Sequence, residues 1–534
     1  MTNSINDMRH AKSFIFIGSN APEAHPVSMQ HILHAKEKNN APIIVVDPRR
    51  TKLAAKATDY VPIRPGTDTA FIIGLVNAVI ANGWADKEFV GTRASGFEAM
   101  AEMAEGAEMA EAAKSFTPEV VENITGIPAG DIVRIAKILA DNRPTSLICS
   151  SGRIRHYIGR SINRGFRILQ LVLGNMGKSG GGINIFRGHD NAPGAMDMCV
   201  LADSLPAYSG LADDSWQHWC RVWDVDYQWI AGRFKEKDWM NKKGLTPARR
   251  YEDLLQGKKD HQFTPLKALI QWGGGSEAIF RHCKVKQADD LLELLVIIDP
   301  FPTMAAAVCE TDNVYLLPSS GQYETSGSVT SSSRQLQWRN KVVDPVHNSK
   351  DDYQIMELLV KKLGFAELFY KNIKQVPEDI TRELGRGALT IGYNGQTPER
   401  IKRHMENWHT FDRDDLQAKG GPCEGEYYGL PWPCWTEEHP GTPILCDVSK
   451  PVAKGDCCLE TVSNCWGNEE ICDAESRVAD QPVATNAVYT STLGSEFQGE
   501  YSDFIDTVPG TDWISDLPRK VIKDAMKDEI VRGI

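Results

Sequence analysis

The chain has 534 residues, and 59 Lys and Arg against 71 Asp and Glu give a formal charge of −12 at pH 7. Hydrophobic residues make up 42% of the chain and charged residues 24%, which excludes general disorder and allows a large buried core. The acidic balance excludes broad nucleic-acid binding but allows a local basic pocket. The sequence contains no run of roughly 18 or more apolar residues, so no transmembrane helix is predicted. The first residues lack a signal-peptide pattern.

Strands and helices alternate in the first part of the chain, which predicts a doubly wound α/β fold. The apolar run Pro42–Asp47 is typical of a strand buried on both faces of a parallel sheet. Thr117 and Pro118 predict a helix start, as N-cap and first helical residue. The predicted strands are 13–17, 42–47, 60–64 and 145–149, and the predicted helices are 24–39, 69–82, 96–115, 129–142 and 160–173.

The middle of the chain repeats this pattern and predicts a second, smaller α/β domain. Its expected strands are 266–272, 295–299 and 314–318, with a helix at 288–294. Residues 205–265 are aromatic and charged, and we interpret them as a surface insertion. From about residue 366 the periodicity weakens, and the stretch Gly420–Trp435 has almost no regular pattern. So long an irregular segment is usually functional or wrapped over another domain.

Both α/β units share a small-residue turn after one strand and an Asp at the end of the next. The pairs are Gly18-Ser-Asn20 with Asp47, and Gly273-Gly-Gly-Ser276 with Asp299. Such turns let main-chain N–H groups approach a phosphate at the carboxyl edge of a sheet. Neither unit contains Gly-x-Gly-x-x-Gly, so a nicotinamide cofactor is not supported. Two copies of this arrangement favour either one extended dinucleotide-like ligand or two such ligands. The equally weighted alternative is that both are ordinary tight turns.

Two further features carry chemically versatile side chains. Arg187 follows the glycine-rich loop 180–182 and could hold a carboxylate through two hydrogen bonds, while His189 could move a proton near neutral pH. The alternative is a structural loop joined by side-chain hydrogen bonds. His25, His31 and His34 lie on or near one predicted helix, and a solvated face is favoured over a metal site.

The twelve cysteines are spread unevenly, with seven between Cys423 and Cys472. No Cys-x-x-Cys or Cys-x-x-x-Cys pair occurs, so a zinc ribbon or an iron–sulfur cluster held by such pairs is not indicated. Buried or free thiols are the favoured interpretation.

Several segments together resemble the molybdopterin oxidoreductase superfamily, and more closely the catalytic subunit of formate dehydrogenase. The resemblance runs in order over residues 1 to about 365, and residues 391–400 and 420–435 extend it into the tail, where they resemble large subunits of respiratory complexes. The matching segments are Gly18–Pro26, Val46–Arg50, Arg64–Asp68, Phe116–Glu119, Ile124–Ile127, Leu173–Gly177, Arg187–Asn191 and Val296–Thr303.

The resemblance implies two αβα domains of the DMSO-reductase-like type at residues 1–188 and 189–365, and an incomplete irregular tail at 366–534. It also implies two molybdopterin guanine dinucleotides around molybdenum or tungsten. One would be lined by Gly18, Asn20, Glu23, Asp47, Arg49, Gly66, Thr67, Asp68 and Gly177, and the other by Gly273, Gly274, Ser276, Asp299 and Thr303. Arg187 matches the active-site arginine that would hold formate, and His189 matches a neighbouring position that varies in the family.

The implied reaction is the two-electron oxidation of formate to CO2, with electrons leaving through a 4Fe–4S cluster. In the family, the cluster domain and a selenocysteine or cysteine metal ligand belong before the segment where this chain begins, so we expect a fragment without metal ligands of its own. The implied partners are an iron–sulfur electron-transfer subunit and a membrane cytochrome subunit, and the implied location of the complete subunit is the periplasm. Another molybdopterin enzyme, such as a nitrate or sulfur-compound reductase, and a non-catalytic fragment are the alternatives.

Overall fold

The structure is a computed structural model. It describes residues 1–93, 116–150, 159–201, 203–234, 237–244, 254–255, 266–274, 282–302, 312–370, 376–388 and 391–449. The helix predicted at 96–115 lies outside these residues. In the described part of the chain, no helix is long and apolar enough to cross a membrane.

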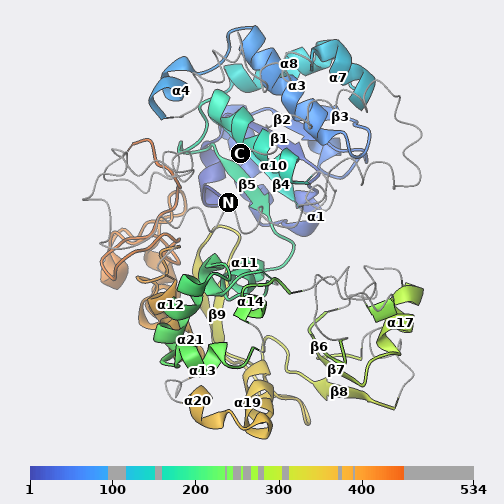
Figure 1. The fold of residues 1–534 in the computed structure, drawn as a ribbon. Helices are drawn as coiled ribbons and strands as arrows, with labels where there is room; N and C mark the ends of the chain where they lie inside the picture. Colours follow the sequence, from blue (N-terminus) through green and yellow to red (C-terminus); the bar gives the residue numbers. More distant parts are fainter. Residues whose placement is uncertain are drawn as a thin grey trace.

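Five parallel strands form the larger sheet, in the order β3-β2-β1-β4-β5 (Figure 1). They are β1 (Ser13–Ile17), β2 (Ile43–Val46), β3 (Asp59–Val61), β4 (Thr145–Ser150) and β5 (Ile183–Phe186). Ile15 lies opposite Ile44 on one side and Leu147 on the other. The chain therefore winds from β1 outward in one direction and then returns to add β4 and β5, which confirms the predicted doubly wound fold.

Alternate residues of the central strand face two helical layers. Phe14 shares a buried cluster with Ile32 of α2 (Ser28–Asn39), whereas Ile15 shares the other cluster with Phe71 of α3 (Asp68–Ala81). Burying each large apolar side chain contributes about 1.5–3 kcal/mol, so a strand that is apolar on both faces is held between two layers. The layer with α3 also contains α7 (Pro118–Thr125), α8 (Ala129–Asp141) and α10 (Gly159–Val172), and α4 (Lys87–Arg93) packs beside it.

Local sequence signals set two helix boundaries in this domain. Thr117 accepts the Val120 N–H at its side-chain oxygen, as predicted for the N-cap of α7. The helix predicted at 24–39 is instead two helices, α1 (Ala21–Ala24) and α2. His25 between them has an extended φ of −140°, because the residue before Pro26 is kept out of the helical region.

The second sheet has three parallel strands, β6 (Ala268–Trp272), β7 (Leu294–Asp299) and β8 (Val314–Pro318), in the order β6-β7-β8. Figure 1 shows it apart from the larger sheet. The helix predicted at 288–294 is wrong, because α17 (His282–Asp289) ends where that helix was to begin. Glu293 already donates its N–H to Lys267 O at 2.8 Å, so the apolar residues after Asp290 lead into β7.

A third core joins the aromatic segment to the start of the tail. It lies between α12 (Asp213–Trp223), the antiparallel pair β9 (Gly327–Thr330) and β10 (Leu336–Arg339), α21 (Val376–Gly387) and α22 (Pro398–Glu406). Trp219 is only 1% exposed, and a side-chain carbon on Gly387 would overlap its ring. The interpretation of 205–265 as a surface insertion is therefore wrong for α12. Residues of η3 (Pro206–Tyr208) and α11 (Ala192–Asp197) belong to this core or pack against it. The remaining helices of this region are α13 (Tyr227–Ala231), α14 (Lys237–Met240), α19 (Asp352–Leu363) and α20 (Ala366–Tyr370), and Ile355 of α19 packs against β7 of the second sheet.

Beyond α22 the tail is irregular and reaches back to the first domain. Only the short turns η4 (Trp408–Thr410) and η5 (Gly421–Cys423) interrupt it among the described residues. Leu445 donates its N–H to Thr2 O at 2.8 Å, and its side chain enters the core of the larger sheet. The tail wraps over another domain, as its composition predicts. Its described cysteines are free and buried, which confirms that interpretation for Cys423, Cys434 and Cys446.

Candidate functional site

The carboxyl ends of β1 and β2 lie side by side and form the first part of the candidate site. Gly18 follows β1 with a φ of +63°, and its N–H donates to Val46 O at 3.0 Å. Asp47 follows β2, and its N–H donates to Val61 O at 3.2 Å. This edge adjoins the point where the strand order reverses, which is where doubly wound sheets bind ligands.

The predicted polar residues of this edge form a small network. Asn20 donates from Nδ2 to the Glu23 carboxylate, and Glu23 Oε1 pairs with Lys52 Nζ at 3.1 Å. Lys52 holds the pKa of Glu23 below its ordinary value, so Glu23 is anionic at neutral pH. Asp47 Oδ1 accepts the main-chain N–H of Arg49 at 2.8 Å, and Arg49 is exposed. Asn20 Oδ1 is buried without a hydrogen-bond partner in the described part of the chain, so it remains free for a ligand.

The turn after β3 adds an open main-chain surface at a helix start. Gly66 has a φ of +83°, and no atom of the described residues lies within 4 Å of the place where a side-chain carbon would sit. Thr67 donates from its hydroxyl to Arg64 O at 2.7 Å, which closes the turn. Asp68 is buried and begins α3. Gly66 thus leaves space for a group to approach the main chain beside Thr67.

The second sheet repeats the arrangement at the ends of β6 and β7. Gly273 has a φ of +59°, and its N–H donates to Ile298 O at 2.8 Å. Among the described residues, neither Gly273 nor Gly274 has an atom within 4 Å of its missing side-chain carbon. Asp299 ends β7 and accepts the Phe301 N–H at 3.0 Å. The other two residues predicted for this half, Ser276 and Thr303, lie outside the described residues.

Gly177 does not join either group. It precedes β5 and therefore lies at the amino edge of the sheet, opposite the edge that carries Gly18 and Asp47. Its φ is +68°, and a side-chain carbon would overlap the carbonyl oxygen of Cys446 in the tail. Val448 donates its N–H to Gly177 O at 3.0 Å. Packing of the tail explains this glycine.

Arg187 follows β5, and its main chain is fixed from two sides. Its N–H donates to Ser332 Oγ at 3.2 Å, and its carbonyl oxygen accepts from His25 Nε2 at 2.6 Å. The guanidinium contacts Met196 Sδ from Nη1 at 2.8 Å, and it forms no ion pair with a carboxylate of the described residues. A guanidinium held in this way keeps donors for a planar anion.

His189, the other predicted catalytic residue, is exposed, and no described residue forms a hydrogen bond with its ring.

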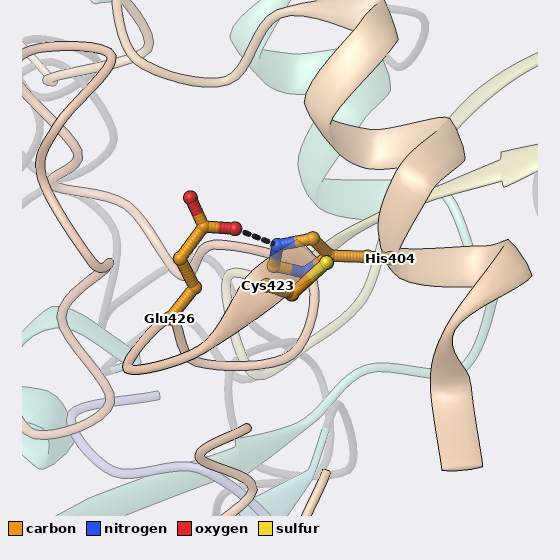
Figure 2. A group of neighbouring side chains, drawn as sticks. All are labelled: His404, Cys423 and Glu426. Carbon is orange, nitrogen blue, oxygen red and sulfur yellow. Dashed lines mark hydrogen bonds and ion pairs between the residues drawn. The ribbon is translucent and has the colours of Figure 1, made fainter. Parts of the chain in front are cut away.

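A separate cluster in the tail brings together three possible metal ligands (Figure 2). His404, Cys423 and Glu426 each offer one ligand atom, and these three atoms lie within 4.8 Å of one another. Gly429 donates its N–H to His404 Nδ1 at 3.0 Å, so the proton of the neutral ring is on Nε2, which donates to Glu426 Oε2 at 2.6 Å. Both ring nitrogens therefore have partners.

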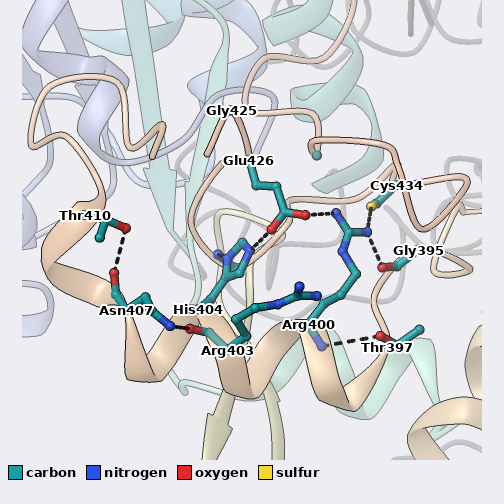
Figure 3. Close-up of polar contacts among 12 residues, drawn as sticks. Gly395, Thr397, Arg400, Arg403, His404, Asn407, Thr410, Gly425, Glu426 and Cys434 are labelled. Carbon is teal, nitrogen blue, oxygen red and sulfur yellow. Dashed lines mark hydrogen bonds and ion pairs between the residues drawn. The ribbon is translucent and has the colours of Figure 1, made fainter. Parts of the chain in front are cut away.

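Glu426 also has a second partner (Figure 3). Its Oε1 accepts from Arg400 Nη2 at 2.7 Å, and Arg400 is only 3% exposed. Burial raises the pKa of the Cys423 thiol, which keeps it protonated. The positive charge of Arg400 balances that of Glu426, and the ring of His404 and the carboxylate of Glu426 both have partners, so these contacts explain the cluster as a buried link between α22 and the tail loop.

A family profile described as "Molybdopterin oxidoreductase" matches residues 1–362. The chain belongs to the molybdopterin oxidoreductase family. Among curated relatives, it is 31% identical to the "F420-dependent formate dehydrogenase subunit alpha" of Methanocaldococcus jannaschii over 83% of this chain and 57% of that protein. It is 27% identical to "Formate dehydrogenase H" of Escherichia coli over 71% of this chain and 49% of that protein. The chain thus spans about half the length of these relatives.

The likeness to a solved structure concerns the fold. "Acetylene Hydratase from Pelobacter acetylenicus" matches with a TM-score of 0.52 and 20% identity, over 75% of this chain and 54% of that one. This result agrees with the predicted α/β class and its two parallel sheets.

The residues at the two sheet edges fit the cofactor that gives the family its name. A molybdopterin carries phosphate and polar ring edges, which need main-chain N–H groups, free acceptors and room near the backbone. The unpartnered Asn20 Oδ1 provides an acceptor, and the open positions at Gly66, Gly273 and Gly274 provide the room.

Sequence reasoning missed the residues that fix Arg187. His25 was grouped with His31 and His34 as part of a solvated helix face, yet it lies between α1 and α2 and contacts Arg187. Ser332 carries no local signal, since its contact spans 145 residues of sequence.

Proposed function

We propose that the protein containing this chain oxidises formate to CO2, or runs the reverse reaction, at a molybdenum or tungsten centre held by two molybdopterin guanine dinucleotides. The observation that carries the proposal is the Arg187 guanidinium, which is fixed at the carboxyl end of β5 and forms no ion pair with a described carboxylate. Formate is a small planar anion, and a guanidinium binds such a group through two parallel hydrogen bonds. The named relatives support formate over other substrates.

The two sheet edges would each hold one dinucleotide. Asn20, Asp47 and Thr67 with their neighbours would contact the first, and Gly273, Gly274 and Asp299 would contact the second. The cofactor held by these residues would supply the acceptor for the two electrons that formate loses. The chain's own residues orient the anion and keep its carboxylate toward the donors of Arg187. In this proposal, electrons leave through a 4Fe–4S cluster to an iron–sulfur partner subunit.

The test uses the protein expressed from its complete reading frame, in a host that makes the cofactor. Formate-dependent reduction of an artificial dye should occur and should fall by about a hundredfold or more in kcat/KM in Arg187→Ala. Arg134→Ala is the matched control, because Arg134 is a surface residue paired with Asp59 at 2.8 Å, and it should stay within about twofold of the parent.

Metal and guanine-nucleotide content of the same preparations separates the outcomes. Stoichiometric cofactor with reduction of nitrate or a sulfur compound, and no response to formate, would replace the proposal with another activity of the family. Absence of both cofactor and turnover would favour a non-catalytic protein.

A further inference from the structure

Arg187 lies against the helix that follows it. Asn191 precedes α11, and its Oδ1 accepts the Thr330 N–H of β9 at 2.9 Å, which fixes the start of the helix. Near the helix end, Met196 Sδ contacts Arg187 Nη1 at 2.8 Å. The position of the guanidinium therefore depends on where the last turn of α11 lies, and Asp197 is the last residue of that turn.

Asp197 is fully buried, and each of its carboxylate oxygens has a tyrosine partner. Tyr208 in η3 donates to Oδ1 at 2.8 Å, and Tyr393 in the tail donates to Oδ2. The hydroxyl of Tyr393 also lies 3.4 Å from Thr330 Oγ1. One carboxyl group thus joins the end of α11 to η3, to β9 and to a tail residue that is 196 positions away in the sequence.

The charges around Asp197 also point to Arg187. Burial raises the pKa of Asp197 to about 6, while the hydrogen bonds of Tyr393 and Tyr208 and the charge of Arg187 act in the opposite direction. Burial, followed by the charge of Asp197, raises the pKa of both tyrosines, so they remain O–H donors. The titratable and charged groups that face Asp197 are therefore Tyr208 from η3, Tyr393 from the tail and Arg187 from the end of β5, and Thr330 of β9 is neutral.

We propose that Asp197 is a positioning residue for Arg187, and that Tyr393 of the tail completes the formate site through it. The inference rests on the proposed function, because it names what holds the residue that is to bind formate. Below about pH 6 Asp197 is neutral and Arg187 presents its full charge to the anion. Above that pH Asp197 is negative and partly offsets the positive charge of Arg187, so formate binding weakens as pH rises through this range.

The experiment measures two quantities on the complete protein between pH 5 and 8. The first is the KM for formate in dye reduction. The second is the Kd for formate from the rise in Tm without an electron acceptor, which needs no turnover. We compare the parent with Tyr393→Phe, with Asp197→Asn and with the double variant, in which the introduced amide oxygen has to accept only from Tyr208. Tyr428→Phe is the matched control, because the hydroxyl of this tail tyrosine contacts Met405 Sδ, at 3.5 Å, and its ring packs against Phe411 rather than near Arg187.

At pH 5, where Asp197 is neutral in both proteins and only its position matters, we expect Tyr393→Phe to raise both KM and Kd for formate about tenfold with a smaller change in kcat, and Tyr428→Phe to change neither by more than about twofold. In the double variant the dependence of Kd on pH between 5 and 8 should disappear. The inference is overturned if Tyr393→Phe behaves like Tyr428→Phe, or if the pH dependence survives in the double variant. If Asp197→Asn does not fold, Tyr393→Phe alone decides.

The two proposals fail in different ways. Formate binding that depends on Arg187 and Tyr393 but gives no turnover would reject formate oxidation and retain the positioning role. Formate turnover with a Kd that Tyr393→Phe does not change would reject the positioning role and retain formate oxidation.

Discussion

His25 donates from Nε2 to the main-chain oxygen of Arg187 across 2.6 Å. The imidazole also packs on Phe186, with ring centroids 4.8 Å apart, so it supports the end of β5 and the residue after it. The contact connects the turn after β1 with the end of β5, although 162 residues separate them.

His25→Ala should therefore lower kcat/KM for formate by about five- to tenfold, which corresponds to the loss of one hydrogen bond worth about 1 kcal/mol. His25→Gln retains a donor and should recover part of the loss. His34→Ala is the control, since His34 of α2 contacts Arg9 and should leave formate kinetics unchanged. Equal kinetics for His25→Ala and the parent would show that the contact does not matter for the site.

Glu426 offers a test of stability that is independent of formate. Glu426→Gln leaves Arg400 buried without its carboxylate, and we expect a loss of about 3 kcal/mol and a lower Tm. Asp415→Asn breaks the exposed pair with Lys419, whose side chains are 46% and 52% exposed, and should cost less than about 1 kcal/mol. Similar Tm values for the two variants would contradict the role assigned to Glu426.

The same cluster predicts how stability changes with pH. Burial lowers the pKa of His404, so the unfolded chain binds the extra proton first and stability falls as pH drops below about 6.5. His404 and Arg400 hold the pKa of Glu426 below its ordinary value against the effect of burial, so its contribution is lost only at still lower pH. Asp197 acts with the opposite sign, because its pKa is raised.

The measurement is therefore a comparison of Tm between pH 7.5 and 5 for the parent and for His404→Gln. Gln can keep a donor toward Glu426 and an acceptor toward Gly429, and it does not titrate. The fall in Tm should be smaller in His404→Gln than in the parent. An identical fall would show that a group other than His404 takes up the proton on unfolding.

The sequence predicted what depends on neighbouring residues and missed what depends on distant ones. The apolar runs of β1 and β2 define strands buried on both faces, and the cap at Thr117 begins a helix. No local pattern in the sequence indicates the pair Asp197 and Tyr393, because the two side chains meet only when the tail packs on α11. Trp219 lacked a signal for the same reason, since it packs against Gly387 of α21, which is distant in the sequence.

Zinc provides a third test of the tail cluster. His404 uses both ring nitrogens and Arg400 balances Glu426, so we expect purified protein to hold no stoichiometric zinc and its Tm to be unaffected by a chelator. Elemental analysis of the parent and of Cys423→Ser checks this. Zinc at one per chain in the parent, lost in Cys423→Ser, would turn the cluster into a metal site.

Two glycines predicted to bind the same kind of cofactor should behave differently. Gly177→Ala places a methyl group on a residue with φ of +68° and against Cys446 O, so it should cost about 2–4 kcal/mol even in protein without cofactor. Gly274 faces open space and its φ is not positive, so Gly274→Ala should change stability by less than about 0.5 kcal/mol. If Gly274 lines the cofactor, its methyl group should instead lower the guanine nucleotide retained after purification severalfold. Tm without cofactor and nucleotide content with it distinguish the two residues, and a Gly274→Ala protein with full nucleotide content would remove Gly274 from the site.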